Sequence, residues 1–520
     1  MPLWQNPEFI RNCRAQLRLR RMLTGFMVVG VLAAVVAYSM HQSYETAGAW
    51  AKPFMILALS FQLGVLGLAG GMACALSIYR EKENNTFDFQ RVTRLTPLEL
   101  TVGKLFGAPV YSYFLAACLM PAALAGAVVA RVGAGYFLTG LFIMVLGSIV
   151  FHALALLMSL LSPRGGSGVP TALVLLFLPL LAVPAMNQSA LKTAGPWAGV
   201  VFASDGSWQT HSTTDWGGLP YAASDWTDLV FGRPMHHIPV LILLYLTLLA
   251  WLLLALVRNI KRDPENLDLY SPEQSIGFLC YLNLLVLAFY TPREWLAQQG
   301  APVAAQRTTV FLLFLGLNVA LLYFLGMTLL RSREQSRRRV YELAVSGPGW
   351  RQAVWPAGYV VVAAACVTLL ICTRYTLASP LRGALDVGIA GFQAAFLLVA
   401  VLRDLLYFQW MKLRRSRYPL VMAVVFLGVF YTCSAILLGT LGGVGAKKSE
   451  FLALLPFPWA AFGLDHSQWP ADRPVWLLAL PAQLGLCALF AWLHYRKLVE
   501  MAPARSAERS PAAAAAPSGM

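Results

Sequence analysis

Long apolar segments, separated by short polar ones, recur along the whole chain of 520 residues. A helix needs about 20 apolar residues to cross a bilayer, and about twelve segments approach this length. The pattern therefore predicts an all-α fold, that of a polytopic membrane protein with about twelve transmembrane helices. The predicted spans are 22–40, 54–79, 105–130, 136–161, 169–186, 238–257, 276–291, 308–330, 353–373, 387–411, 418–441 and 475–495.

The order of spans and loops repeats between the two halves of the chain. In each half the largest loop on one side joins the second and third predicted spans, at 80–104 and at 331–352. This repeat predicts two pseudo-symmetric six-helix units, although chance similarity of loop lengths is the alternative. The expected domains are a cytoplasmic amphipathic elbow helix at 1–21, a first unit at 22–257, a cytoplasmic linker at 258–275, a second unit at 276–495 and a disordered cytoplasmic tail at 496–520.

Composition excludes a soluble protein, because only 12% of the residues are charged and 58% are hydrophobic, whereas soluble proteins carry about 25% charged residues. The net charge is +16. Most Lys and Arg gather in short segments between the apolar runs, which favours topology signals over a nucleic-acid surface. Alternating the spans from a cytoplasmic N-terminus places most of these residues inside, so both termini are expected in the cytoplasm.

No motif in the chain predicts catalysis or a bound cofactor. The Gly-rich stretch 442–449 lacks the spacing of a phosphate-binding loop and follows an apolar span instead of a strand. The eight Cys form no C-x-x-C pair and are interpreted as small hydrophobic residues. We therefore expect no metal site and no cofactor in this chain.

The loop 80–104 mixes acidic, basic and aromatic residues. Thr96, Pro97 and Glu99 have the spacing of a capping box with Pro at the first helical position. A short helix is therefore predicted to begin at Pro97 and to run into the third span.

This loop resembles a known family of membrane proteins. Four features of the loop are similar to the permease subunits of ABC-2 type ABC exporters. They are its acidic stretch, the aromatic pair Phe87 and Phe89, the Thr-Pro-Leu at 96–98 and the Gly-Lys-Leu at 103–105. The basic head 6–21 is similar to the elbow helix of that family. The resemblance covers residues 6–130 well and the second half more loosely, because the stretch around Pro348 lacks a Gly-Lys-Leu.

The resemblance implies a permease that couples ATP hydrolysis on a separate ATP-binding subunit, in two copies, to substrate export. ATP and magnesium are expected on that partner. The resemblance leaves open whether further membrane or periplasmic subunits take part. The expected location is the bacterial inner membrane. The alternative for the loops is an ordinary solvated surface. The positions to which the resemblance assigns coupling are Glu81, Glu83, Asp88, Thr96, Pro97, Glu99, Lys104, Glu342 and Pro348.

Three polar residues fall within predicted spans. Arg403 and Asp404 are expected to anchor helices or to line a gate or substrate path, each with its own partner, because adjacent residues point to different sides of a helix. His152 predicts a polar bond between helices or a place on that path.

Two other functions compete with ATP-driven export. A secondary, ion-coupled transporter has a similar number of spans, but only Asp404 supplies a carboxylate within one. A membrane-embedded enzyme would use an extracytoplasmic site. Its acid–base groups would come from Asp205, His211, Asp215, Asp225 and Asp228, whose spacing matches no known motif.

Overall fold

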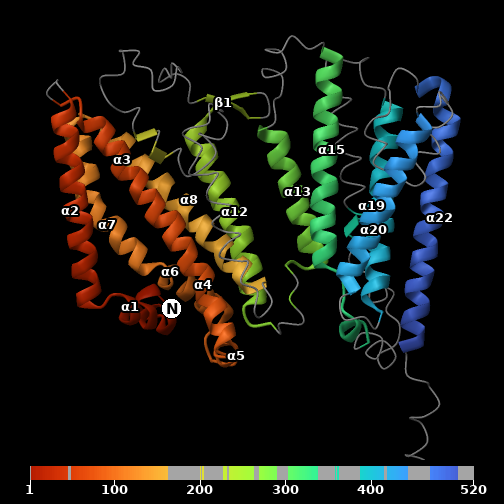
Figure 1. Ribbon diagram of the computed structural model, residues 1–520, viewed down its shortest axis with the longest axis horizontal. Helices are drawn as coiled ribbons and strands as arrows, with labels where there is room; N and C mark the ends of the chain where they lie inside the picture. Colours follow the sequence, from red (N-terminus) through yellow and green to blue (C-terminus); the bar gives the residue numbers. More distant parts are fainter. Residues whose placement is uncertain are drawn as a thin grey trace, which may run out of the picture. The chain divides into compact units, whose positions relative to one another are not determined.

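The computed structural model is predominantly helical and contains a short β-hairpin (Figure 1). It describes residues 2–44, 48–161, 199–203 without 201, 227–262 without 231 and 232, 267–289 without 268, 303–337, 358–363 without 359 and 362, 387–414, 419–442 and 469–501.

The chain divides into two compact units, Met1–Leu267 and Asp268–Met520. Within the described residues, six helices are long and apolar enough to cross a membrane. The protein is therefore membrane-embedded. Two of the predicted spans, 169–186 and most of 353–373, lie outside the described residues.

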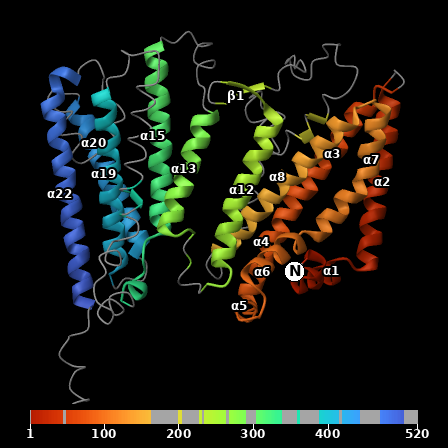
Figure 2. The same cartoon turned by 180° about the vertical axis from the view of Figure 1, so that it is seen from behind.

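Unit 1 begins with two helices that lie at a steep angle to each other (Figures 1 and 2). A short 3-10 turn and α1 lie across one end of the unit, and α2 then runs along its edge. Pro121 lies within α7. The elements are η1 (Leu3–Gln5), α1 (Pro7–Gln16), α2 (Leu19–Ser43), α3 (Ala51–Gly64), the π-helical turn η2 (Val65–Gly70), α4 (Gly71–Glu83), α5 (Phe87–Arg91), α6 (Pro97–Gly107), α7 (Val110–Val129), α8 (Ala134–Leu161), β1 (Thr227–Val230), β2 (Arg233–His236) and α12 (His237–Asn259).

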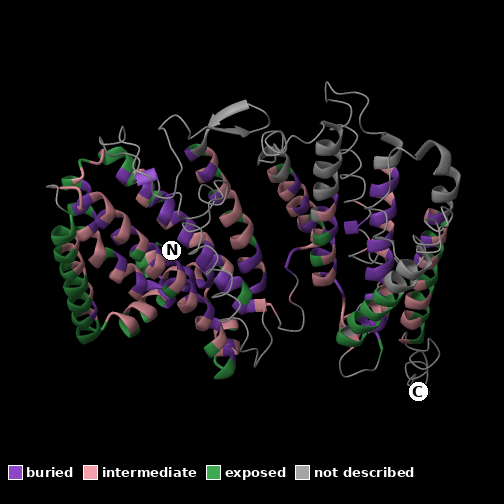
Figure 3. Cartoon of the chain, turned by 45° about the horizontal axis from the view of Figure 1, so that its top comes forward, coloured by how far each residue is buried: buried purple, intermediate pink, exposed green. Residues whose placement is uncertain are grey.

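The core of unit 1 lies between α3, α7 and α8. Met55 and Leu59 of α3 and Met144 of α8 are almost completely buried there. On the other side of α8, Ile143 packs in a second cluster with Leu241 of α12. By contrast, α2 is exposed along most of its length (Figure 3). Apolar side chains exposed along a whole helix are what contact with lipid requires.

Unit 2 contains α13 (Pro272–Phe289), α15 (Val303–Thr328), α19 (Val387–Lys412), α20 (Pro419–Gly442) and α22 (Trp469–Met501). The central helix of this set is α19, which contacts α15, α20 and α22. α19 is also the most buried of the candidate spans, with 78% of its most apolar window inside the protein. A helix buried on all sides can keep polar side chains only if they have partners.

Two predicted boundaries differ from the structure. The second predicted span lies within one continuous helical stretch, Ala51–Glu83, that contains the π-helical turn η2, whereas the third is interrupted where α6 ends and α7 begins. Pro109 separates α6 from α7, because proline has no N–H to continue a helix. α22 continues to Met501, so the first residues of the predicted disordered tail are helical.

Candidate functional site

The first turn of α1 is fixed by Asn6. Its side-chain oxygen accepts hydrogen bonds from the backbone N–H of Glu8 and of Phe9, at 3.0 Å and 3.3 Å, and Pro7 occupies the first helical position. The Asn6 amide also donates to the backbone carbonyl of Glu99 at 2.7 Å. One side chain therefore caps α1 and holds it against α6.

A Schellman motif ends α4 and directs the loop that follows. Thr86 N–H donates to the carbonyl of Glu81 at 2.9 Å, and Asn85 N–H donates to that of Lys82 at 3.3 Å. Asn85 has a φ of 56°, a left-handed conformation that asparagine tolerates better than most residues. The chain therefore turns sharply from α4 into α5.

The predicted capping box at the start of α6 is confirmed. Glu99 N–H donates to the Thr96 hydroxyl at 3.2 Å, and Thr96 N–H donates to the Glu99 carboxylate at 2.9 Å. Pro97 is the first helical residue. The hydrogen bond from the Thr96 backbone lowers the pKa of Glu99.

Two glycines allow α1 to lie directly on α6. A Cβ added at Gly103 would lie 2.7 Å from Asn6 Oδ1 and 2.8 Å from Glu8 Cβ. A Cβ at Gly107 would lie 3.0 Å from Asn12 Nδ2. The sequence Gly-x-x-x-Gly thus forms the surface on which α1 packs.

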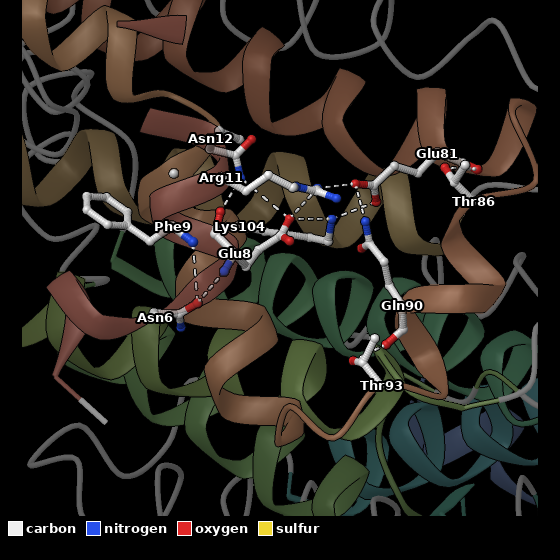
Figure 4. A network of polar contacts seen from close by, with 12 residues as sticks. Asn6, Glu8, Phe9, Arg11, Asn12, Glu81, Thr86, Gln90, Thr93 and Lys104 are labelled. Atoms are coloured by element: carbon white, nitrogen blue, oxygen red, sulfur yellow. Dashed lines mark hydrogen bonds and ion pairs between the residues drawn. The ribbon is translucent and has the colours of Figure 1, made fainter. Parts of the chain in front are cut away.

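A largely buried ion cluster, with Arg11 at its exposed edge, joins α1, α4 and α6 (Figure 4). Lys104 Nζ lies 2.6 Å from Glu81 Oε2 and 3.1 Å from Glu8 Oε1. Arg11 contacts the same two carboxylates, at 2.9 Å and 2.7 Å. The Lys104 side chain is fully buried, so its charge requires these partners. Two positive and two negative charges balance within the cluster.

Further hydrogen bonds extend this cluster into the loop. Gln90 of α5 donates to Glu81 Oε1 at 2.7 Å, which places α5 against the end of α4 (Figure 4). Lys261, just after α12, donates to the carbonyl of Thr93 at 2.7 Å. The loop between α4 and α6 is therefore attached at both of its ends and in its middle.

Lys82, the neighbour of Glu81, connects α4 to α8. Its ammonium group donates to the carbonyls of Ser159 and Leu160, at 3.0 Å and 2.6 Å. These carbonyls belong to the last turn of α8, where no helical N–H is available. The Ser159 hydroxyl in turn donates to the carbonyl of Ala75. The end of α4 is thus held on two sides.

Apolar side chains are exposed at the tip of the same loop. Phe87 is 4% exposed and anchors α5, whereas Phe89 is 75% exposed and Val92 is 81% exposed. Residues two apart lie about 200° apart on a helix, so Phe87 and Phe89 point to opposite sides. Phe89 is thus exposed on the same short helix whose Gln90 contacts the ion cluster.

The remaining predicted coupling residues have smaller roles in the structure. Glu83 is exposed and accepts a hydrogen bond from the Tyr79 hydroxyl at 2.5 Å. Asp88 pairs with Arg91 one turn later, at 3.1 Å. Glu342 and Pro348, in the second half, lie outside the described residues.

His152 is fully buried and bonded to two other helical segments. Its Nε2 lies 2.7 Å from the carbonyl of Leu66 in η2, and its Nδ1 lies 3.0 Å from the Tyr113 hydroxyl. A carbonyl can only accept, so Nε2 carries the proton and Nδ1 accepts from Tyr113. A Cβ at Gly70 would lie 2.4 Å from Nε2, so only glycine fits there. The predicted interhelical bond is confirmed.

The prediction that Arg403 and Asp404 have separate partners is wrong. Arg403 donates to Asp404 Oδ1 through Nε at 2.8 Å and through Nη2 at 2.6 Å. Adjacent side chains leave a helix in different directions, but the Arg403 side chain is long enough to bend back and reach Asp404.

The other oxygen of Asp404 is also engaged. Tyr323 of α15 and Tyr431 of α20 each donate to Oδ2 at 2.5 Å. Arg403 additionally bonds to Gln483 of α22 at 2.7 Å and to Tyr431. Four donors satisfy the acceptor sites of the Asp404 carboxylate. This arrangement favours an anchor between helices over an ion-binding carboxylate.

Several of these partners were missed in the sequence. Glu8 follows Asn-Pro and is the first acidic residue of a basic head, and no role was predicted for it from the sequence. Lys104 is the stronger signal, because a lysine at the start of an apolar span either extends to the membrane surface or pairs with a buried acceptor. Tyr323, Tyr431 and Gln483 carry no comparable signal, since such residues are common in apolar helices.

Comparisons with protein-family models, with curated proteins and with solved structures gave no significant match for this chain.

Proposed function

We propose that this chain is the membrane subunit of an ATP-driven exporter of the ABC-2 type, powered by a separate ATP-binding protein. The observation that carries the proposal is the ion cluster of Lys104, Glu81, Glu8 and Arg11. It joins the loop 80–104 to α1 and to α6, the helix that leads toward α7. A displacement of this loop would therefore be transmitted to the membrane helices.

The exposed tip supports the same proposal. Phe89 and Val92 are exposed on a loop whose base is fixed. Exposed apolar side chains beside charged ones are typical of protein-binding surfaces. In the proposal this tip lies in the cytoplasm and binds the ATPase, whose closure on ATP shifts the transporter between inward-open and outward-open states.

The test is co-purification of the full chain from its own cells in mild detergent. We expect a soluble ATPase in the complex, and we expect Phe89→Asp or Val92→Asp to reduce its yield by at least about tenfold, a loss of about 1.4 kcal/mol. The matched control is Val499→Asp, which places the same charge on an exposed apolar position of α22. Substrate movement by the purified chain alone, driven by an ion gradient, would contradict the proposal and favour a secondary transporter.

A further inference from the structure

A groove of about 800 Å³ runs along the outside of unit 1, beside the ion cluster. Its long wall is one face of α3, η2 and α4, formed by Phe61, Val65, Leu68, Met72 and Leu76. These positions are spaced by three or four residues, so they form one continuous stripe. The groove volume falls within the range of small-molecule sites.

One end of this groove is polar and positively charged. Asn12 and Gln16 of α1 close it, and Arg21 and Arg80 lie at its edge. Gln16 is fixed by a hydrogen bond to the carbonyl of Ala108 at 2.9 Å. The polar end of the groove is therefore closed by α1.

The two arginines at this end carry charge that no carboxylate neutralises within the described residues. Arg21 lies over the ring of Tyr111, at 4.1 Å from its centroid. Arg80 is exposed, and its guanidinium has no ion pair in the described part of the chain. Glu81 also lines the groove, but its carboxylate is engaged by Lys104, Arg11 and Gln90. The polar end therefore attracts an anion.

We propose that this groove binds one anionic phospholipid of the leaflet next to α1. The phosphate lies between Arg21 and Arg80, and an acyl chain follows the stripe from Leu76 toward Phe61. An apolar groove at membrane depth is not filled by water, whereas acyl chains are the surrounding solvent. Clusters of basic residues beside a membrane helix favour anionic headgroups, by about 1 kcal/mol for each residue. This inference does not depend on the proposed transport function.

The bound lipid also connects the elbow helix to α4. Its headgroup lies between the polar face of α1 and Arg80, one residue before Glu81 of the ion cluster. The lipid therefore adds a second link between the elements that the Lys104 cluster already joins.

The experiment places the full chain in nanodiscs that contain a trace of phosphatidylglycerol with a photoreactive acyl chain. Labelled peptides are then identified by mass spectrometry. We expect labelling within 61–76, and we expect Arg21→Gln with Arg80→Gln to reduce it by about 25-fold. The control pair Arg14→Gln and Arg20→Gln removes the same charge from exposed residues that do not line the groove.

A second pair of variants tests the apolar part of the site. Ala69→Trp fills the groove and should abolish labelling of 61–76, whereas Val31→Trp on the exposed face of α2 should leave it unchanged. Equal labelling by a phosphatidylcholine probe, or equal loss in both arginine pairs, would overturn the proposal. A chain-to-chain adduct from a photoreactive amino acid at Leu68 would also overturn it, in favour of a second copy of the chain.

Discussion

The Lys104 ammonium group lies 2.6 Å from the carboxylate of Glu81, a residue in the last turn of α4, 23 positions earlier in the chain. Lys104 is fully buried and Glu81 is 14% exposed, so this ion pair is shielded from water and salt. It fixes the base of the loop between α4 and α6 to the helix that leads toward α7. The stability of this end of unit 1 should therefore depend on it.

Replacing Lys104 with Met removes the cation and leaves two carboxylates with only Arg11. We expect a loss of about 3–5 kcal/mol in the free energy of unfolding, because the remaining buried charge is uncompensated. Unfolding in detergent, followed by tryptophan fluorescence, measures this loss. Arg14→Met, on the exposed side of α1, is the control and should change stability by less than about 0.5 kcal/mol.

A double-mutant cycle isolates the pair itself. Lys104→Met combined with Glu81→Gln should be clearly less damaging than the sum of the two single changes. Strictly additive losses in the free energy of unfolding would show that the contact between the two side chains contributes no interaction energy.

Gly103 should not tolerate a side chain. Gly103→Ala places a Cβ against Asn6 and Glu8, so α1 must move away at a cost of about 1–3 kcal/mol. Limited trypsin digestion checks this, because cleavage after Arg11 and Arg14 should accelerate once α1 is displaced. Gly30→Ala is the matched control, since nothing lies within 4 Å of its added Cβ. Equal digestion of the two variants would contradict the close approach of α1 and α6.

The Arg403–Asp404 pair should be more costly to break than to replace. Asp404→Asn leaves a buried guanidinium without its carboxylate, and we expect a loss of about 3–5 kcal/mol. Arg403→Met combined with Asp404→Leu removes both charges together with their hydrogen bonds to Tyr323, Tyr431 and Gln483, so its loss of stability should be clearly smaller than that of Asp404→Asn without being zero. Transport by the double variant then separates the two roles, because an anchor is dispensable and a gate is not. Loss of transport in a stable double variant would assign the pair to the substrate path.

The capping box at α6 should respond to acid. The pKa of Glu99 is lowered by the backbone hydrogen bond from Thr96, so its contribution is complete above the ordinary glutamate pKa of about 4.3. It is lost as the pH falls through the lower pKa of the folded state. Hydrogen exchange of the first α6 amides should therefore accelerate in acid, beyond the intrinsic pH dependence of exchange. In Glu99→Gln this extra acceleration should disappear.

Thr96→Ala tests the other half of the same box. Removing the hydroxyl leaves the Glu99 N–H without its acceptor, and the expected cost is about 1 kcal/mol. The change should be confined to the first turn of α6, which local hydrogen exchange resolves. Uniform loss of protection along α6 and α7 would show that the cap supports more than its own turn.

The sequence by itself determined the features that depend on neighbouring residues. The apolar runs gave the membrane class, because burying a backbone in lipid requires helices of a minimum length. Thr96, Pro97 and Glu99 gave the start of α6, since a cap involves residues only three apart. The ABC-2 resemblance, the twelve spans and the coupling role remain predictions.

The tertiary structure alone decided which distant side chains meet. Glu8 is brought to Lys104 because Gly103 and Gly107 admit α1, whereas Glu81 comes from α4. The Gly-x-x-x-Gly spacing indicates that some helix can approach closely, but not which one. The π-helical turn that presents the Leu66 carbonyl to His152 is also invisible in the sequence, because it depends on packing against α8. The Arg403–Asp404 contact was predicted wrongly for a related reason. Backbone geometry sets where a side chain starts, whereas a long, buried guanidinium bends toward whichever carboxylate the surrounding helices leave within its reach.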